Sequence, residues 1–250
     1  VLMAGCGLYA LIGFPLDDIW HRIFGQDVTL WGPTHLMLIG GAGLSLVATL
    51  LLEREGDIAM GADAPPARSK VLPYLAFGGL VIGLSVFPVE YDFGVEQFRL
   101  VLHPMLIAAA AAMSLVATRL TLGRFSTFGA IAFALFIRGL VALAVGPILG
   151  SPYSWCALYL GSAIVVELIG LTPLVNRPIL FGAVAGLGVG TVGMWLESFW
   201  VDALFRTPWP SSMWGEALTM STPVAIGMGM CGALLALVLT GQRLPARPVG

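Results

Sequence analysis

The feature that most restricts the fold is a series of apolar stretches, most of them close to the roughly 20 residues that a helix needs to cross a bilayer. Only 10% of the 250 residues are charged, against about 25% in a soluble domain. We therefore expect an all-α integral membrane protein, a single domain over residues 1–250 with a bundle of seven or eight transmembrane helices. The expected spans are 1–14, 34–52, 71–88, 101–118, 126–148, 154–174, 178–197 and 221–240.

The uneven distribution of basic residues predicts the orientation. Eight follow the even-numbered spans or lie in the C-terminal tail, whereas three share the opposite loops with nine acids. Because positively charged loops stay in the cytoplasm, we expect a cytoplasmic C-terminus, a cytoplasmic loop at 53–70 and an outer-face loop at 198–220. The first stretch is short and begins at Val1, so we expect a helix that is truncated at its N-terminus.

Composition also narrows the location and the partners. A net charge of -2 without a basic cluster argues against nucleic acid. Eleven of the 12 basic residues are arginine, a bias typical of GC-rich bacterial genomes, so we expect a multi-pass protein of a bacterial plasma (inner) membrane. All seven tryptophans fall on the predicted outer side. Besides lipid, this asymmetry favours other membrane subunits or an outer-face domain as partners.

Ionisable groups concentrate in the segment DDIWHRIFGQDVTLWGPTH, residues 17–35. Pro15 is expected to start a short helix with Asp17 in its first turn, and on such a helix Asp17 and His21, four residues apart, share one face. Thr34 is expected to be the N-cap of the next span, which leaves His35 in its first turn. The three ligand-type side chains are then predicted to converge, and imidazole with carboxylate suits copper, zinc or iron. The alternative is an interfacial Asp–His hydrogen bond and a helix cap.

Further residues are candidates for completing this site. His103 and Glu197 fall on the same side, and either could supply a fourth ligand, with His103 preferred because imidazole suits copper better. Asp27 and Trp31 are expected to contact and orient the ligand histidines.

Two charges fall inside predicted spans, Arg138 and Glu167. Because isolated charges are costly in lipid, we expect them to form an intramembrane ion pair with each other.

Residues 17–35 resemble the metal-site segment of the C subunit of copper membrane monooxygenases, the particulate methane and ammonia monooxygenase family. The segment ESFWVDALFRTP, residues 197–208, is similar to a later family segment, with Glu197 where that family has a histidine. The resemblance implies that Asp17, His21 and His35 are similar to the family's copper ligands. The positions that match in the first segment are Asp17, Trp20, His21, Asp27, Pro33, Thr34 and His35.

These observations favour a copper-binding integral membrane subunit of an oxidoreductase complex, with the monooxygenases as its model and its metal at the outer face. No residue is assigned a catalytic role. Two alternatives stay open. His35 and His103 could be the axial ligands of a b-type haem in an electron-transfer subunit, or the chain could be a non-catalytic structural subunit of a membrane complex.

Overall fold

The computed structural model describes residues 1–25, 30–61, 71–94, 97–151, 158–205 and 207–241, and in these ranges all regular secondary structure is helical. Six helical segments among them are long and apolar enough to cross a bilayer, and two shorter apolar helices, α3 (Leu72–Leu84) and α7 (Leu160–Gly170), accompany them. The chain is a multi-pass helical membrane protein. The six segments are α1 (Leu2–Phe24), α2 (Pro33–Met60), α5 (Leu102–Leu122), α6 with η2 (Ser126–Ile148), α8 with η4 and α9 (Pro178–Leu204), and η5 with α10 (Ser211–Thr240).

Several helices extend beyond the predicted apolar stretches. Helix α2 continues to Met60, inside the expected 53–70 loop, and residues 62–70 lie outside the described part of the chain. Helix α9 (Met194–Leu204) and helix α10 (Trp214–Thr240) likewise enter the expected 198–220 loop. The reason is that glutamate, alanine and methionine continue a helix as readily as leucine does. Hydropathy locates the apolar part of a helix but not its ends.

Helix α1 is one continuous helix, so the expectation that Pro15 starts a separate short helix is wrong. Pro15 lies in the interior of α1, where it removes one backbone hydrogen bond. In lipid an interrupted helix would leave further peptide groups without partners, which favours a helix that continues through the proline. Asp17 therefore lies in the second half of a 23-residue helix and not in a first turn.

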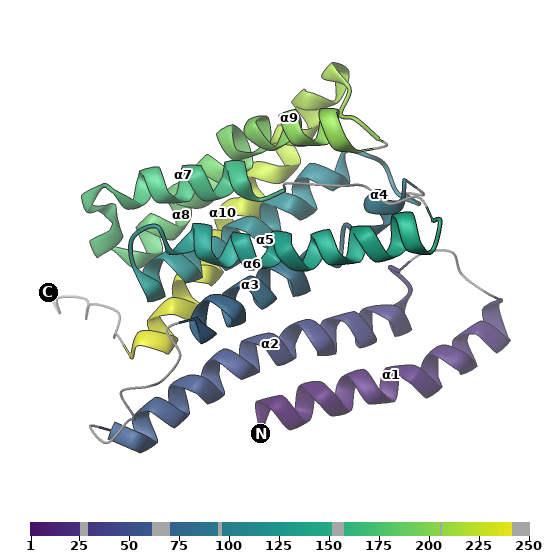
Figure 1. Cartoon of the computed structure of the whole chain (residues 1–250), viewed down its shortest axis with the longest axis horizontal. Helices are drawn as coiled ribbons and strands as arrows, with labels where there is room; N and C mark the ends of the chain where they lie inside the picture. Colours follow the sequence, from purple (N-terminus) through teal and green to yellow (C-terminus); the bar gives the residue numbers. More distant parts are fainter. Residues whose placement is uncertain (26–29, 62–70, 95–96, 152–157, 206, 242–250) are drawn as a thin grey trace, which may run out of the picture.

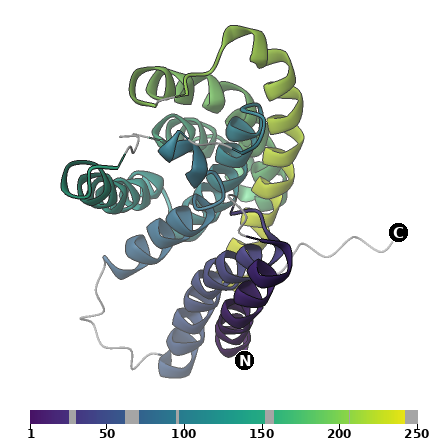
Figure 2. The same ribbon diagram turned by 90° about the vertical axis from the view of Figure 1, so that its right-hand side faces the viewer.

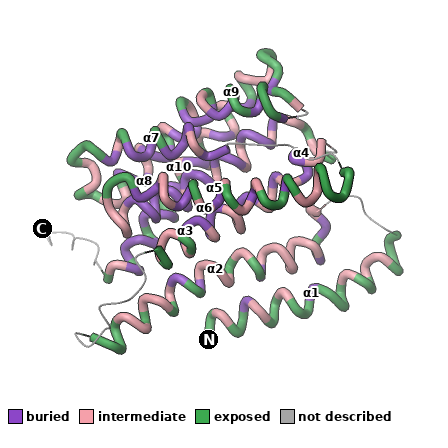
Figure 3. The backbone as a smooth tube through the Cα atoms, in the orientation of Figure 1, coloured by how far each residue is buried: buried purple, intermediate pink, exposed green. Residues whose placement is uncertain are grey.

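Helix α5 is the centre of the bundle. It packs against α3, α6, α7, α8 (Pro178–Gly188) and α10, and Figure 1 shows it between these helices. Most of its residues are buried (Figure 3). Ile107, Ala111 and Leu115 are completely so. The alanine run from 108 to 112 keeps the surface of α5 narrow, so that neighbouring helices can approach its backbone.

Helices α1 and α2 form a hairpin at one side of this bundle. They pack along each other, α2 also contacts α3, and the pair lies beside the remaining helices in Figure 2. Most of α1 is exposed, as Figure 3 shows. Its exposed residues include apolar ones such as Leu11 and Phe14. This is the arrangement expected of a helix whose outer surface meets an apolar environment.

Arg138 and Glu167 each have an ion-pair partner, but the predicted pair between them is wrong. Arg138 on α6 (Ser126–Leu143) donates to Asp92 Oδ1 at 2.7 Å, on the short helix α4 (Val89–Phe93). Glu167 lies 3.0 Å from Nε of Arg119, and it accepts a hydrogen bond from the backbone N–H of Thr127 at the start of α6. Arg138 is eleven residues further along α6 than Thr127, about 16 Å at 1.5 Å per residue. Glu167 is therefore out of its reach.

Candidate metal centre

Helix α1 places Asp17 and His21 on one face, one turn apart. Their side chains meet there, with His21 Nε2 lying 3.3 Å from Asp17 Oδ2. One turn before Asp17, Gly13 leaves room for Leu38 of α2, since a Cβ at Gly13 would lie 2.9 Å from Leu38 Cδ2. The missing side chain lets α2 approach α1 closely just before the polar residues. As a result, the face that carries Asp17 is turned toward α2.

The start of α2 brings the third side chain. Gly32 is the N-cap and Pro33 the first helical residue, where its preset φ and missing N–H cost nothing. The expectation that Thr34 caps the helix is therefore wrong, although His35 lies in the first turn. From there His35 Nε2 reaches to 3.3 Å from Asp17 Oδ1, and the two imidazole rings are 5.6 Å apart. One carboxylate thus faces two imidazoles, one through each oxygen.

Two neighbours hold these groups in place. The hydroxyl of Thr34 donates to Asp17 Oδ1 at 2.5 Å, and Nδ1 of His21 lies 3.2 Å from the carbonyl oxygen of Gly25. Because a carbonyl oxygen only accepts, Nδ1 of His21 carries the proton and Nε2 is the atom available as a ligand. The contact of His21 with the Gly25 carbonyl cannot be predicted from the sequence, because every residue has a backbone carbonyl. The interpretation of Thr34 as a helix cap predicts the wrong hydrogen-bond partner for its hydroxyl.

The donor set fits a transition-metal ion. One ligand atom from each of Asp17, His21 and His35 lies within 4.8 Å of the others. Imidazole nitrogen and carboxylate oxygen bind such ions at about 2.0–2.2 Å, and two ligands at that distance are about 3.3 Å apart at a tetrahedral angle. Both Asp17–histidine separations have this value, which is also that of an ion pair between aspartate and protonated histidine. The three side chains are 20–24% exposed, so the cluster is accessible from outside the protein.

His103 does not join this cluster, so the suggestion that it supplies a fourth ligand is not supported. It is completely buried, its ring stacks on Tyr91 at 4.4 Å, and its Nδ1 accepts a hydrogen bond from Trp209 Nε1 at 3.2 Å. The cause is packing, because α4 and the segment before α10 surround the start of α5 with aromatic rings. The haem alternative needs His35 and His103 on opposite sides of one iron, and the structure places them in different surroundings.

Glu197 is not a ligand of this cluster either, because it caps a helix. Its carboxylate is completely buried and accepts hydrogen bonds from the backbone N–H groups of Tyr159 at 2.9 Å and Ser162 at 2.8 Å. These donors lie at the N-terminus of α7, where unpaired N–H groups attract an anion. The hydroxyl of Ser162 also donates to it at 2.9 Å. Both oxygens of the carboxylate are therefore hydrogen-bonded to the start of α7.

The two predicted orienting residues have different outcomes. Asp27 lies outside the described residues. Trp31 contacts the rings of Phe87 and Phe98, at 5.8 and 5.6 Å, and so ties the segment before α2 to the segments around α4. A residue that the sequence does not single out adds to this connection, since Glu90 accepts a hydrogen bond from the backbone N–H of Leu30 at 2.5 Å. The start of α2 is thus anchored to the bundle.

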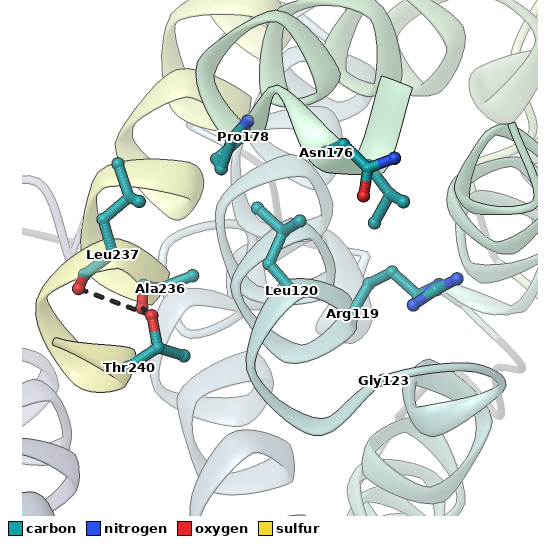
Figure 4. Close-up of a pocket in the computed structure, with 9 residues that line it drawn as sticks. Arg119, Leu120, Gly123, Asn176, Pro178, Ala236, Leu237 and Thr240 are labelled. Atoms are coloured by element: carbon teal, nitrogen blue, oxygen red, sulfur yellow. Dashed lines mark hydrogen bonds between the residues drawn. The ribbon is translucent and has the colours of Figure 1, made fainter. Parts of the chain in front are cut away.

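A pocket of about 270 Å³ lies at the opposite end of the molecule, where α5 and α10 end (Figure 4). Two of its polar side chains are engaged within the protein. Thr240 donates to the carbonyl of Ala236 at 2.8 Å, and Arg119 pairs with Glu167 and donates to the carbonyl of Gly170 at 2.6 Å. These contacts are typical of helix ends that are held together. We therefore place the candidate site at Asp17, His21 and His35.

Comparisons with protein-family models, curated proteins and solved structures find no match to this chain.

Proposed function

We propose that this chain is the copper-binding integral membrane subunit of an oxidoreductase complex, with one metal ion held by Asp17, His21 and His35. The observation that carries the proposal is that one carboxylate oxygen and two imidazole nitrogens converge within 4.8 Å. The local resemblance of residues 17–35 to copper membrane monooxygenases favours copper over zinc and iron. It also makes monooxygenase-type chemistry the first reaction class to test.

The residues have distinct roles in this proposal. Copper, when bound, would supply a redox-active Lewis acid. Asp17 contributes a negative charge against the cation, and the two histidines contribute neutral nitrogen ligands. The Gly25 carbonyl fixes the ring of His21 with Nε2 toward the site. Three protein ligands leave a position for water, for a further side chain or for a substrate.

We also propose the orientation and the setting. The excess of basic residues at the other end of the helices supports a cytoplasmic C-terminus and a metal site at the outer face of a bacterial plasma membrane. The tryptophans on the metal-site side support an outer-face domain or neighbouring membrane subunits as partners. Lipid would cover the apolar surface of α1.

The test is the metal content of the purified protein, measured by elemental analysis beside a visible spectrum. We expect about one copper per chain in wild type, because the cluster offers three ligands to one ion. His21→Ala and His35→Ala should each abolish copper retention, and Asp17→Ala should weaken it less. A strong visible band with iron would favour the b-haem alternative, whereas wild-type protein without stoichiometric metal would favour a structural subunit.

A matched control comes from the residue next to Asp17. Asp18 lies on the same helix, is exposed and pairs with Arg22 at 2.8 Å. Asp18→Ala removes the same charge from the same turn without touching the cluster, so it should keep the wild-type copper content. Loss of copper in Asp18→Ala would indicate a general effect of charge and would contradict ligation by Asp17.

A further inference from the structure

Thr34 combines burial with a strong hydrogen bond to the candidate site. It is 6% exposed, and its hydroxyl donates to Asp17 Oδ1 at 2.5 Å. This oxygen–oxygen distance lies at the short end of the range in which a hydroxyl donates to an ionised carboxylate. Asp17 lies on α1, whereas Thr34 is the second residue of α2, whose N-cap is Gly32. The side chain is thus directed across the helix interface and not to its own backbone.

The hydrogen bond determines how the Asp17 carboxylate is presented. Oδ1 receives the Thr34 hydroxyl and also faces His35, while Oδ2 faces His21 at 3.3 Å. A carboxylate without such a donor rotates about its terminal torsion, which is broad and nearly two-fold. With one lone pair of Oδ1 engaged, the group is held in the orientation that gives one oxygen to each imidazole.

The hairpin does not depend on Thr34 for its packing. Helices α1 and α2 already approach closely at Gly41, where a Cβ would lie 2.8 Å from the backbone nitrogen of Ala10, and at Gly13 against Leu38. These contacts lie closer to the middle of the helices than the cluster does. The close packing at these glycines therefore does not involve the hydroxyl of Thr34.

We propose that Thr34 is a positioning residue of the metal site, which keeps the Asp17 carboxylate oriented for shared ligation with His21 and His35. This inference rests on the proposed metal-binding function. Outer contacts of this kind typically change metal affinity by about 10–100-fold when removed. The donor that matters is the hydroxyl, so serine should replace threonine and valine should not.

The experiment compares Thr34→Val and Thr34→Ser with wild type. The apparent Kd for Cu(II) is measured by competition with a chelator, and the parallel hyperfine coupling of bound Cu(II) by EPR. Thr34→Val should bind copper about 10–100-fold more weakly and show an altered coupling, because Asp17 moves. Thr34→Ser should match wild type in both. Thr34→Ala is a second variant without the hydroxyl and decides the question if the valine variant does not fold.

Thr49→Val is the matched control. Thr49 lies on the same helix, but its hydroxyl donates to the carbonyl of Ser45 at 2.9 Å, so its loss should change neither readout. Suppose that wild type binds copper and that Thr34→Val and Thr34→Ala bind it with the same affinity and the same hyperfine coupling as wild type. This result would overturn the role of Thr34 and leave the proposed function intact. Wild-type protein that binds no copper would overturn both.

Discussion

At the scale of single residues, Arg138 and Asp92 lie 2.7 Å apart and both are buried, so each charge is compensated by the other. Removing one partner of such a pair costs about 3–5 kcal/mol, because the remaining charge is left in a medium of low dielectric constant. We therefore expect Arg138→Met to lower the free energy of unfolding in detergent by this amount. Adding Asp92→Leu should recover much of the loss.

The control for this prediction uses the other buried carboxylate. Glu167 pairs with Arg119, so adding Glu167→Leu to Arg138→Met should not restore stability but reduce it further. Denaturant or thermal unfolding of the two double variants distinguishes the pairings. Recovery with Glu167→Leu instead of Asp92→Leu would show that Arg138 does not pair with Asp92.

At the scale of helices, the crossing of α8 and α10 depends on glycine. A Cβ at Gly186 would point directly onto the carbonyl oxygen of Ala225, which is backbone and cannot move aside without shifting the helix. We expect Gly186→Ala to destabilise the protein by about 1–3 kcal/mol, the usual cost of overpacking. The measurement is the midpoint of unfolding in detergent.

Gly227 provides the comparison on α10 itself. A Cβ there would meet no heavy atom within 4 Å, and alanine is the better helix former by about 1 kcal/mol. Gly227→Ala should therefore be neutral or slightly stabilising. If both alanine variants lowered the midpoint equally, close packing at Gly186 would not be the cause.

The helices show how far the sequence predicts this fold. Six of the expected spans coincide with helical segments long enough to cross a bilayer, as burial in lipid requires, whereas 71–88 and 154–174 contain the shorter helices α3 and α7. Apolar length does not locate helix ends. The sequence also does not show that Pro15 lies inside α1, because a proline is tolerated inside a helix when lipid makes an interruption more costly. Apolar length also does not predict which helices pack against each other. Asp92, the partner of Arg138, lies on the short helix α4, outside any recognised span.

The candidate site was more predictable than its surroundings. Asp17 and His21 are four residues apart on a helix, and a glycine–proline pair starts α2 just before His35, so local rules bring them close. The surroundings depend on contacts between distant segments. His103 stacks on an aromatic ring, and Glu197 accepts hydrogen bonds at the start of α7. Both contacts follow from the packing of segments far apart in the sequence.

At the scale of the whole molecule, the proposed orientation puts the metal site and the C-terminus on opposite sides of the membrane. In a background without the native cysteines, Ser212→Cys should react with a membrane-impermeant thiol reagent in intact cells, because it is exposed and lies just before α10, at the end of that helix opposite to the pocket. Glu55→Cys, exposed in the last turns of α2 and far from His35 at its start, should react only after the cells are opened. The reversed pattern would move the metal site to the cytoplasmic side.

The proposed copper site requires that both histidines bind one copper ion. Pulsed EPR of the Cu(II)-loaded protein measures this directly, since the remote nitrogen of each ligating imidazole modulates the electron spin echo. We predict two imidazoles in wild type, one in any residual copper signal of His21→Ala or His35→Ala, and two in Asp18→Ala. A wild-type signal without imidazole modulation, or two imidazoles remaining in His21→Ala, would contradict the assignment of Asp17, His21 and His35 as a copper site.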